Sequence, residues 1–585
     1  MCQKFIHWMS WDGARADMNR VSVTTWPSNH KLIWLLPISS ASLGFILALC
    51  GNAYSFSDSV SYLDMGDAFF AGNWRAIFNG LWSPLYPLLL GFIRWLVKPS
   101  MHWEGTAVQL ANWVVFLCAI LSFHFFWGEL LALYRHVSQA REDNRITLSG
   151  TEFWLLGYVI FLFMHLNLVT SVTPDMLLST FVYLASGLLV KIVLCGSTLG
   201  RFCALGLVLG FGFLAKAVML PLAGVYLVIA AVSSLRQRSM IFHLSASIIL
   251  FCLLAGPYVT GLSKKEGRFT VGDAGALNYS WHVNGAPTYQ WQSSPPGSDH
   301  PEHAIRMILA SPQVFEFGEP IIATYPPWYD PAYWNAGLHP RFEWAVQIKT
   351  IKFTMGRYLQ LFWDQSVLIG GLVILLVMRR DSVRTILKEF LAVWPVWAPA
   401  LAAFSIYGVI WVEPRHVAQF FVLFWGAVLT LVRLPNSPDL QRLVRAVVVL
   451  LVIAMGAHSL NLVAHAGYYG HHASDLQTMQ AERLRASGLY PGIKVATIGE
   501  WSSDEGWQHI ARLRVVAEVP VGDEFWSAND AIRSHVYDLL AQAGAKYVIT
   551  SAPSKLCEEC WVPDWASSAG WVHVDDTPLY LFRLN

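Results

Sequence analysis

Apolar runs long enough to cross a lipid bilayer recur through most of the first 463 residues. An α-helix needs about 20 mostly apolar residues to span the hydrocarbon core. Candidate runs lie at residues 32–51, 107–134, 152–170, 176–195, 201–215, 217–235, 241–261, 355–378, 388–411, 416–433 and 444–463. Because 55% of the 585 residues are hydrophobic and only 14% are charged, the chain has more apolar surface than a soluble core of this length can bury. The sequence predicts an α-helical polytopic membrane protein with about eleven spanning helices.

The segment 83–97 is apolar but too short to be counted as a span. It would reach only about 22 Å as a helix, and it contains Pro84 and Arg94. We therefore predict a juxtamembrane or re-entrant helix. With this choice the positive-inside rule places the Arg-rich and Lys-rich connections, such as 135–145 and 379–388, in the cytoplasm. The N-terminus is then predicted inside and the C-terminus outside.

Three regions follow from this topology. Residues 1–31 form a cytoplasmic segment, and residues 32–463 form a transmembrane domain with external loops at 52–106 and 262–350. Residues 464–585 begin with a polar linker, YYGHHASD, and continue with strand patterns (IKVATIG, KYVIT, WVHV, LYLFRL) and one helix pattern (AIRSHVYDLLAQAGA). The pattern predicts a small extracytoplasmic α/β domain. It lacks the spaced glycines of a dinucleotide site.

Overall charge and cysteine content exclude or leave open several functions. The net charge of +1 gives no basic field for nucleic acid. Cys557 and Cys560 form an isolated CxxC that is compatible with a disulfide, with free thiols or with half of a metal site. The first apolar run begins too deep in the chain for an ordinary signal peptide, so it is expected to remain as an anchor.

The first external loop contains a cluster of acidic residues in FSDSVSYLDMGDAFF. Ser57 or Asp58 is a suitable cap for an amphipathic helix on the membrane surface. Asp58 and Tyr62 are candidate site residues. Asp64 and Asp67 share a helix face and are possible secondary acidic groups. Alternatively, these carboxylates simply favour the positive end of a helix dipole.

Three further segments place ionisable groups at boundaries of apolar runs on the same predicted side. Asp175 follows the turn T-P-D, Lys216 interrupts a long apolar stretch, and WVEPRH holds Glu413, Arg415 and His416. An ionised side chain at the membrane centre costs about 3 kcal/mol. Snorkelling of Lys and Arg to the interface explains many isolated cases. Convergence of several such groups on one face favours a substrate site, and the Arg fork suits a phosphate.

These motifs together, in this order, resemble the GT-C superfamily over roughly residues 30–430. The nearest shape is the branch of protein O-mannosyltransferases and the lipid A aminoarabinose transferase. The resemblance implies a plasma or inner membrane of bacterial type, a polyprenyl-phosphate sugar donor and inverting transfer at the outer face, with Asp58 near the acceptor. Ser59 replaces the Glu that follows the Asp in many relatives, and Ser83 precedes Pro84 where some relatives have a basic residue. A divalent metal therefore stays an open possibility, and no other cofactor is expected.

The residue types agree with this chemistry. A sugar hydroxyl is a weak nucleophile, so a carboxylate must accept its proton; Asp58 is the predicted base, with Asp175 as its partner or orienter. The leaving lipid phosphate needs cations placed in advance, for which Lys216 and Arg415 are the candidates. Tyr62, Glu413 and His416 are predicted to contact substrate. An aromatic cluster within 281–334 either stacks on sugar rings or forms an interfacial belt.

Two other functions remain as alternatives. A transporter of a lipid-linked or anionic substrate would also contain broken helices and charged groups, although no internal repeat of residues 30–230 is evident in 350–465. A non-catalytic membrane scaffold is the second alternative. For a transferase, the sequence leaves open whether the sugar is a hexose or a pentose, and whether the acceptor is a lipid, a glycan or a protein.

Overall fold

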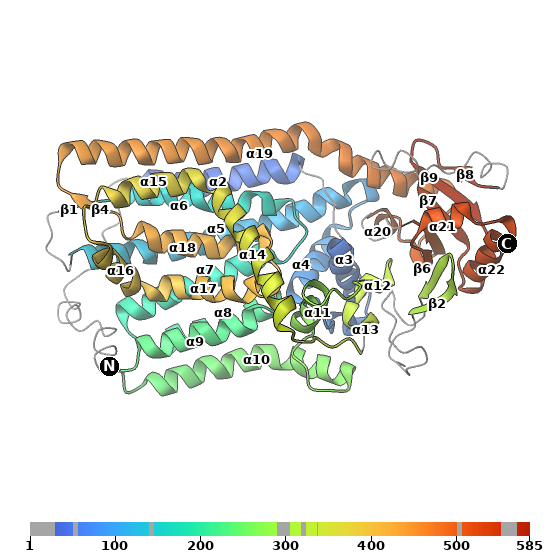
Figure 1. Cartoon of the computed structure of the whole chain (residues 1–585), viewed down its shortest axis with the longest axis horizontal. Helices are drawn as coiled ribbons and strands as arrows, with labels where there is room; N and C mark the ends of the chain where they lie inside the picture. Colours follow the sequence, from blue (N-terminus) through green and yellow to red (C-terminus); the bar gives the residue numbers. More distant parts are fainter. Residues whose placement is uncertain are drawn as a thin grey trace.

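The computed structural model describes residues 30–50, 57–139, 145–288, 305–317, 323–335, 337–499, 506–551 and 570–584. Figure 1 shows a body of long helices at one end of the molecule and a sheet at the other. Most of the predicted N-terminal segment 1–31 lies outside the described residues, as do Cys557 and Cys560.

Within the described residues, six helical stretches are long and apolar enough to cross a membrane. They are formed by α2 (His30–Cys50), α5 (Met101–Gln139), α6 (Gly150–His165) with the 3₁₀ turn η2 (Leu166–Val169), α7 (Asp175–Cys195), α10 (Met240–Glu266) and α19 (Pro438–Ala486). Three shorter apolar helices accompany them: α8 (Leu199–Ala215), α9 (Met219–Ser233) and α18 (Pro414–Leu429). Each matches a run found in the sequence, but the count of eleven spans stays a prediction because these three are shorter than a full crossing.

Two runs that the sequence presents as single spans are pairs of helices with a sharp bend. α14 (Trp344–Asp364) meets α15 (Ser366–Val377) at 73°, and α16 (Val383–Ala392) meets α17 (Trp394–Gly408) at 87°. The second bend lies next to Pro395, which lacks a backbone N–H and disfavours helical geometry in the residue before it. The Trp397 indole donates to the carbonyl of Phe390 across this break.

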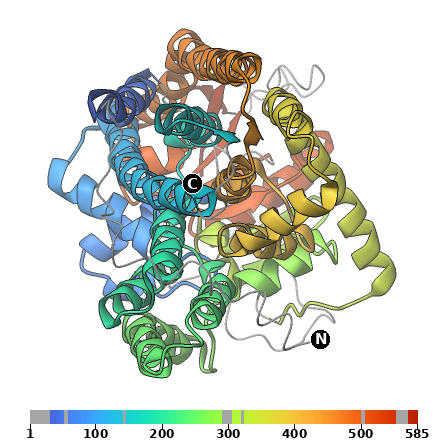
Figure 2. The ribbon, with the colours of Figure 1, turned by 90° about the vertical axis from the view of Figure 1, so that its left-hand side faces the viewer.

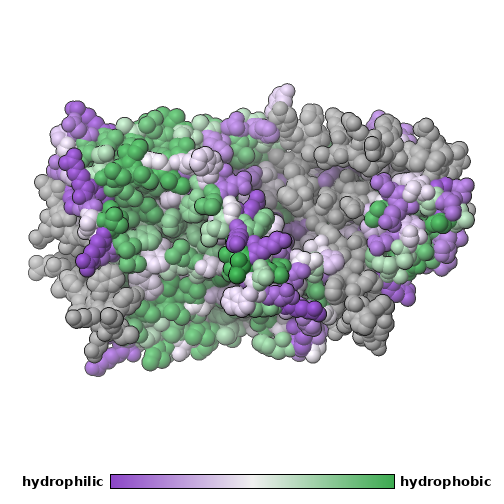
Figure 3. All heavy atoms as spheres, viewed as in Figure 1, coloured by the Kyte–Doolittle hydropathy of each residue, from purple (hydrophilic) through white to green (hydrophobic). Residues whose placement is uncertain are grey.

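The surface of the helical body agrees with a membrane location. Figure 3 shows hydrophobic side chains over most of this body in the view drawn, with hydrophilic side chains at its far end and on the sheet. At that far end a short antiparallel pair, β1 (Arg145–Thr147) and β4 (Arg433–Pro435), closes the bundle. Seen end-on in Figure 2, the helices pack around one another rather than in a single layer. The chain is an integral membrane protein.

Short helices lie between the two bodies (Figure 1). They are α3 (Ser57–Phe70), η1 (Trp74–Ile77), α4 (Leu85–Val97), α11 (Ala274–His282), α12 (Pro326–Tyr329) and α13 (Pro331–Trp334). α3 is the helix predicted after Ser57, and α4 is the predicted short helix of 83–97. These two cross where Gly66 meets Gly91: a Cβ on Gly91 would lie 2.7 Å from backbone atoms of Gly66. Only glycines permit so close an approach of two backbones.

Among the described residues, the sheet has seven strands in the order β2-β3-β6-β5-β7-β9-β8. Its strands are β2 (Ile305–Ala310), β3 (Gln313–Phe317), β5 (Lys494–Ile498), β6 (Arg514–Val519), β7 (Tyr547–Ser551), β8 (Val572–His573) and β9 (Leu579–Arg583), and its helices are α20 (Trp507–Ile510), α21 (Gly522–Ser527) and α22 (Asp530–Gln542). β5 is parallel to β6 and β7, and the other pairs are antiparallel.

Two features of this region differ from the sequence interpretation. The hairpin β2–β3 comes from the second external loop, yet β3 pairs with β6 and so belongs to the C-terminal sheet. The linker YYGHHASD is helical, because it lies within α19, a continuous helix of 49 residues. The stretch contains no proline to end the helix. α19 therefore connects the membrane body directly to the sheet (Figure 1).

The contact between α3 and α4 should be sensitive to a single methyl group. Gly91→Ala would force two backbones apart with no flexible side chain to move, so we expect a loss of about 1 to 3 kcal/mol in unfolding free energy. Gly224→Ala in α9 is the control, because a Cβ there would meet no atom within 4 Å. Thermal unfolding in detergent should show a lower Tm for Gly91→Ala only. Equal Tm values for both variants would contradict the close approach.

Candidate active site

A cavity of about 530 Å³ lies where the membrane helices meet the short helices beside the sheet. All four segments singled out in the sequence contribute to its wall, through Asp58 and Tyr62, Asp175, Lys216, and Glu413 with Arg415 and His416. The rest of the wall is mostly apolar or aromatic, with residues such as Phe213, Leu220, Ile406, Trp82, Trp281 and Trp328. Asp58 and Arg415, which are 357 residues apart in the sequence, therefore line one space.

Lys216 and Asp175 form the deeper ion pair of the cavity. α8 ends at Ala215, and Lys216 takes an extended conformation before α9 begins, so the helix break predicted at this position is present. Its Nζ lies 2.5 Å from Oδ1 of Asp175, in the first turn of α7. Asp175 is 1% exposed, and its Oδ2 has no hydrogen-bond partner among the described residues. That oxygen can accept a further hydrogen bond.

Asp58 lies in the first turn of α3 and lines the cavity. The Trp328 indole Nε1 donates to its Oδ1 at 3.1 Å, and Nη2 of Arg415 lies 3.5 Å from its Oδ2. Burial raises the pKa of Asp58 above its ordinary value, while Arg415 and the indole partly oppose this shift. A carboxylate with a raised pKa is a stronger base than one in water.

Arg415 is held between two carboxylates at the start of α18. Its Nε lies 2.6 Å from Oε2 of Glu413, whose other oxygen accepts from the Trp411 indole at 3.0 Å. Burial raises the pKa of Glu413, but Arg415 and His416 outweigh that effect and lower it to about 2. Glu413 therefore stays ionised and orients Arg415 toward Asp58. The ring of His416 stacks on Tyr407 with 5.1 Å between centroids.

Tyr62 lines the cavity one helical turn beyond Asp58. Its ring meets Trp82 and Tyr86 edge to face, at centroid distances of 5.1 and 5.4 Å. Trp82 and Trp281 in turn contact Trp328, which places three tryptophans beside Asp58. Sequence reasoning identified Trp281 and Trp328 within an aromatic cluster but missed Trp82 and Tyr407, since nothing in the local pattern marks them.

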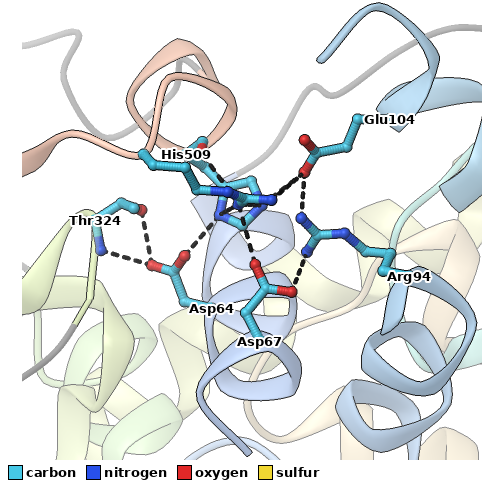
Figure 4. A network of polar contacts seen from close by, with 7 residues as sticks. Asp64, Asp67, Arg94, Glu104, Thr324 and His509 are labelled. Carbon is cyan, nitrogen blue, oxygen red and sulfur yellow. Dashed lines mark hydrogen bonds and ion pairs between the residues drawn. The ribbon is translucent and has the colours of Figure 1, made fainter. Parts of the chain in front are cut away.

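Asp64 and Asp67 lie away from the cavity. Figure 4 shows them in a separate polar network that joins α3 to the sheet. Oδ1 of Asp64 lies 2.6 Å from Nδ1 of His509 in α20, and Asp67 pairs with Arg94 at 2.9 Å. Neither carboxylate is placed to replace Asp58 in the cavity.

A metal site was left open by the sequence, and the cavity side chains do not fit one. Asp58 and Glu413 are paired with Arg415, and Asp175 is paired with Lys216. Within the part of the chain that the structure describes, no group of three or more His, Cys, Asp or Glu side chains is arranged to hold an ion.

A buried amide fixes the two ion pairs relative to each other. Gln419 in α18 is 0% exposed; its Nε2 donates to the carbonyl of His416 at 3.1 Å, and its Oε1 accepts from Ser179 at 3.2 Å. Ser179 also lies 2.9 Å from the carbonyl oxygen of Asp175. The first turns of α7 and α18 are therefore joined by one polar bridge.

Removing this bridge should weaken both the fold and the site. Gln419→Leu removes this acceptor but leaves the Ser179 hydroxyl its contact with the Asp175 carbonyl, so we expect a loss of about 0.5 to 1.5 kcal/mol in unfolding free energy. A double-mutant cycle with Ser179→Ala, measured by thermal unfolding, should give a coupling energy above about 0.5 kcal/mol. Gln542→Leu on the exposed face of α22 is the control. Additive effects of the two substitutions would rule out the bridge.

Comparison with known proteins gives a match in structure only. No family model matches the chain, and no curated protein matches its sequence. ArnT from Cupriavidus metallidurans bound to undecaprenyl phosphate superposes with a TM-score of 0.54 at 11% identity, covering 95% of this chain and 98% of that one.

Two weaker matches accompany it. Apo ArnT from the same organism gives a TM-score of 0.43 at 14% identity, covering 94% of this chain and 97% of that one. An oligosaccharyltransferase from Archaeoglobus fulgidus gives 0.42 at 12% identity, covering 88% and 68%. The superposition on ligand-bound ArnT confirms the expected resemblance to the GT-C fold over nearly the whole chain.

Proposed function

We propose that the protein is a membrane glycosyltransferase that moves a sugar from a polyprenyl-phosphate donor to an acceptor hydroxyl, with inversion at the anomeric carbon. One observation carries the proposal: a partly buried carboxylate, Asp58, and two cations, Lys216 and Arg415, line the same largely apolar cavity. The fold adds support, because ArnT, which shares it, was crystallised with undecaprenyl phosphate.

Asp58 is the proposed general base. The acceptor oxygen bonds to the anomeric carbon from the side opposite the phosphate, the bond from that carbon to the phosphate oxygen breaks, and the acceptor proton passes to Asp58. Trp328 and Arg415 hold the carboxylate in place for this step. Asp175 acts through Lys216, whose Nζ it orients.

The leaving group explains the two cations. A polyprenyl phosphodiester carries one negative charge, and the phosphate monoester that leaves carries up to two. Cations fixed before the reaction stabilise this added charge without reorganising. Arg415 and Lys216 border the cavity with about a quarter of each side chain exposed, 23% in both cases. Glu413 and His416 support Arg415 at the start of α18.

The wall of the cavity suits the two ends of a lipid-linked sugar. Apolar residues such as Val218, Leu220 and Ile410 line one part, as an isoprenoid chain requires. The three tryptophans Trp82, Trp281 and Trp328, with Tyr62, line another part, where sugar C–H groups can pack on aromatic faces. We assign the sugar, hexose or pentose, to this aromatic part.

The side of the membrane is also proposed. Arg145, Arg379 and Arg433 gather at the end of the helical body opposite the sheet, where Arg145 and Arg379 both pair with Asp381. The positive-inside rule makes that end cytoplasmic. The cavity and the sheet then face the outside, where a lipid, glycan or protein acceptor is met, and the C-terminus lies there too.

Release of polyprenyl phosphate tests the activity directly. Purified protein in nanodiscs is given a panel of radiolabelled polyprenyl-phosphate sugars with cell-extract acceptors. Asp58→Asn should lower turnover by about 10² to 10⁴-fold while donor binding survives, whereas Asp523→Asn, at an exposed carboxylate in α21, should match wild type. Undiminished turnover by Asp58→Asn would move the base to Asp175. Absence of turnover with every donor would reject the transferase.

The pH dependence gives a second test. Asp58 must be ionised to accept a proton, so kcat/KM should fall as pH drops through its pKa. Because that pKa is raised above 3.8, the acid limb should have its midpoint above pH 3.8, while Glu413, with a pKa of about 2, stays charged throughout. Returning samples to pH 7 controls for acid unfolding. A midpoint at or below 3.8 would contradict the assignment of Asp58.

A further inference from the structure

The segment of residues 323–334 lies between α3 and the sheet, and Trp328 is its contact with Asp58. Two atoms of Trp328 hold α3: the indole donates to Asp58 at 3.1 Å, and the backbone carbonyl accepts from the hydroxyl of Ser61 at 2.6 Å. The same carbonyl accepts from the Trp82 indole at 3.3 Å. The position of Trp328 therefore decides where the Asp58 carboxylate lies.

The start of the segment is fastened to the sheet. The carbonyl of Thr324 accepts from the backbone N–H of Val515 at 2.9 Å, which extends the pairing of β6. The hydroxyl of Tyr325 donates to Oε2 of Glu518, also on β6, at 2.9 Å. Tyr325 is 4% and Glu518 is 1% exposed. A buried carboxylate that accepts a hydrogen bond from a hydroxyl group makes a strong, directional contact.

Pro326 and Pro327 join the two ends of the segment. Proline fixes φ near −65°, so two in succession form a stiff spacer between Tyr325 and Trp328. The carbonyl of Pro326 also accepts from the Trp334 indole at 2.5 Å. A shift of Tyr325 on the sheet is therefore transmitted to Trp328 instead of being absorbed by the backbone.

The polar network of Figure 4 adds a parallel connection. Oδ2 of Asp64 accepts from both the backbone N–H and the hydroxyl of Thr324, at 2.8 and 2.7 Å, while its other oxygen meets His509. Arg512 reaches Asp67 at 3.0 Å and Glu104 at 3.2 Å. The C-terminal region thus contacts α3 at Asp64 and Asp67, about two turns beyond Asp58.

We propose that Tyr325 and Glu518 are positioning residues for Asp58, so that the C-terminal sheet holds the base of the reaction in place through Trp328. This inference rests on the proposed function for its kinetic consequence, but its mechanical part stands on these contacts alone. It assigns the sheet a role within the catalytic site.

Tyr325→Phe removes one hydroxyl and keeps the ring. Loosening Trp328 misplaces Asp58, so kcat should fall by about 10 to 100-fold, with a smaller rise in the donor KM because Trp328 also lines the part of the cavity assigned to the sugar. Loss of the indole hydrogen bond also favours the protonated carboxyl, so the acid limb should move to higher pH. Glu518→Ala should behave alike, and Glu518→Gln, which keeps an acceptor oxygen, should restore most of kcat.

Tyr537→Phe is the matched control. The Tyr537 hydroxyl accepts from the Trp571 indole at 3.0 Å within the sheet region, far from Asp58 in the sequence and outside the residues that line the cavity. It should lower Tm by an amount similar to Tyr325→Phe but leave kcat and the acid limb unchanged. If Tyr325→Phe and Tyr537→Phe both have the kcat and the acid limb of wild type, the proposal is wrong.

Hydrogen–deuterium exchange of the full-length protein separates this proposal from the proposed function. Tyr325→Phe should speed amide exchange in peptides from 57–70 and 323–334, with no change in 530–542. Faster exchange without any turnover by wild type would keep the mechanical connection and reject the transferase. Unchanged exchange in both peptides would reject the connection whatever the activity. If Tyr325→Phe folds poorly, Trp328→Phe, which removes the indole hydrogen bond to Asp58 and keeps an aromatic ring, repeats the exchange measurement on residues 57–70.

Discussion

Charges buried among apolar helices determine how this protein is arranged around its cavity. Lys216 cannot stay within a continuous α8–α9 helix surrounded by apolar groups without a partner, and Asp175 supplies one at 2.5 Å. Removing one member of a buried pair typically costs about 3 to 5 kcal/mol. The ion pair of Lys216 with Asp175 therefore holds the helix break after α8 next to the first turn of α7.

Arg415, Glu413 and Asp58 form a second charge cluster. Its ion pairs fix α18 relative to the short helix α3 in the same way. Arg415 lies between Glu413 and Asp58, so α18 and α3 are drawn to one point. Gln419 then ties this cluster to the helix that contains Asp175. The groups that stabilise the fold here are also chemically versatile, because the cations that pair with the cavity carboxylates are those suited to a phosphate.

Much of this arrangement could be predicted from local sequence signals. Apolar runs located the helices, and the breaks at Asp175, Lys216 and Glu413–His416 located the charged groups that the structure brings together. The features that the sequence did not predict depend on partners that are far away in the sequence. In the sequence Trp82 is one apolar residue among many, and only its contact with Trp328 marks it as part of the site. Asp64 and Asp67 resemble active-site carboxylates in the sequence, but in the structure they pair with His509 and Arg512. Likewise, β3 shows no sign in sequence that β6 will be its neighbour.

That last pairing has a consequence for biosynthesis. The partner of Glu316 in β3 is Ala517, about 200 residues later, with several membrane helices between them. At about 5 to 20 residues per second, the ribosome needs roughly 10 to 40 seconds to supply β6. During this interval β3 is an open edge strand, the kind of surface on which chains aggregate. Arg306 and Glu316 form an ion pair across the β2–β3 hairpin. They place charged side chains on the unpaired hairpin, and such charges oppose aggregation at an edge strand. The contact of Tyr325 with Glu518 can therefore form only after residues 514–519 have been synthesised.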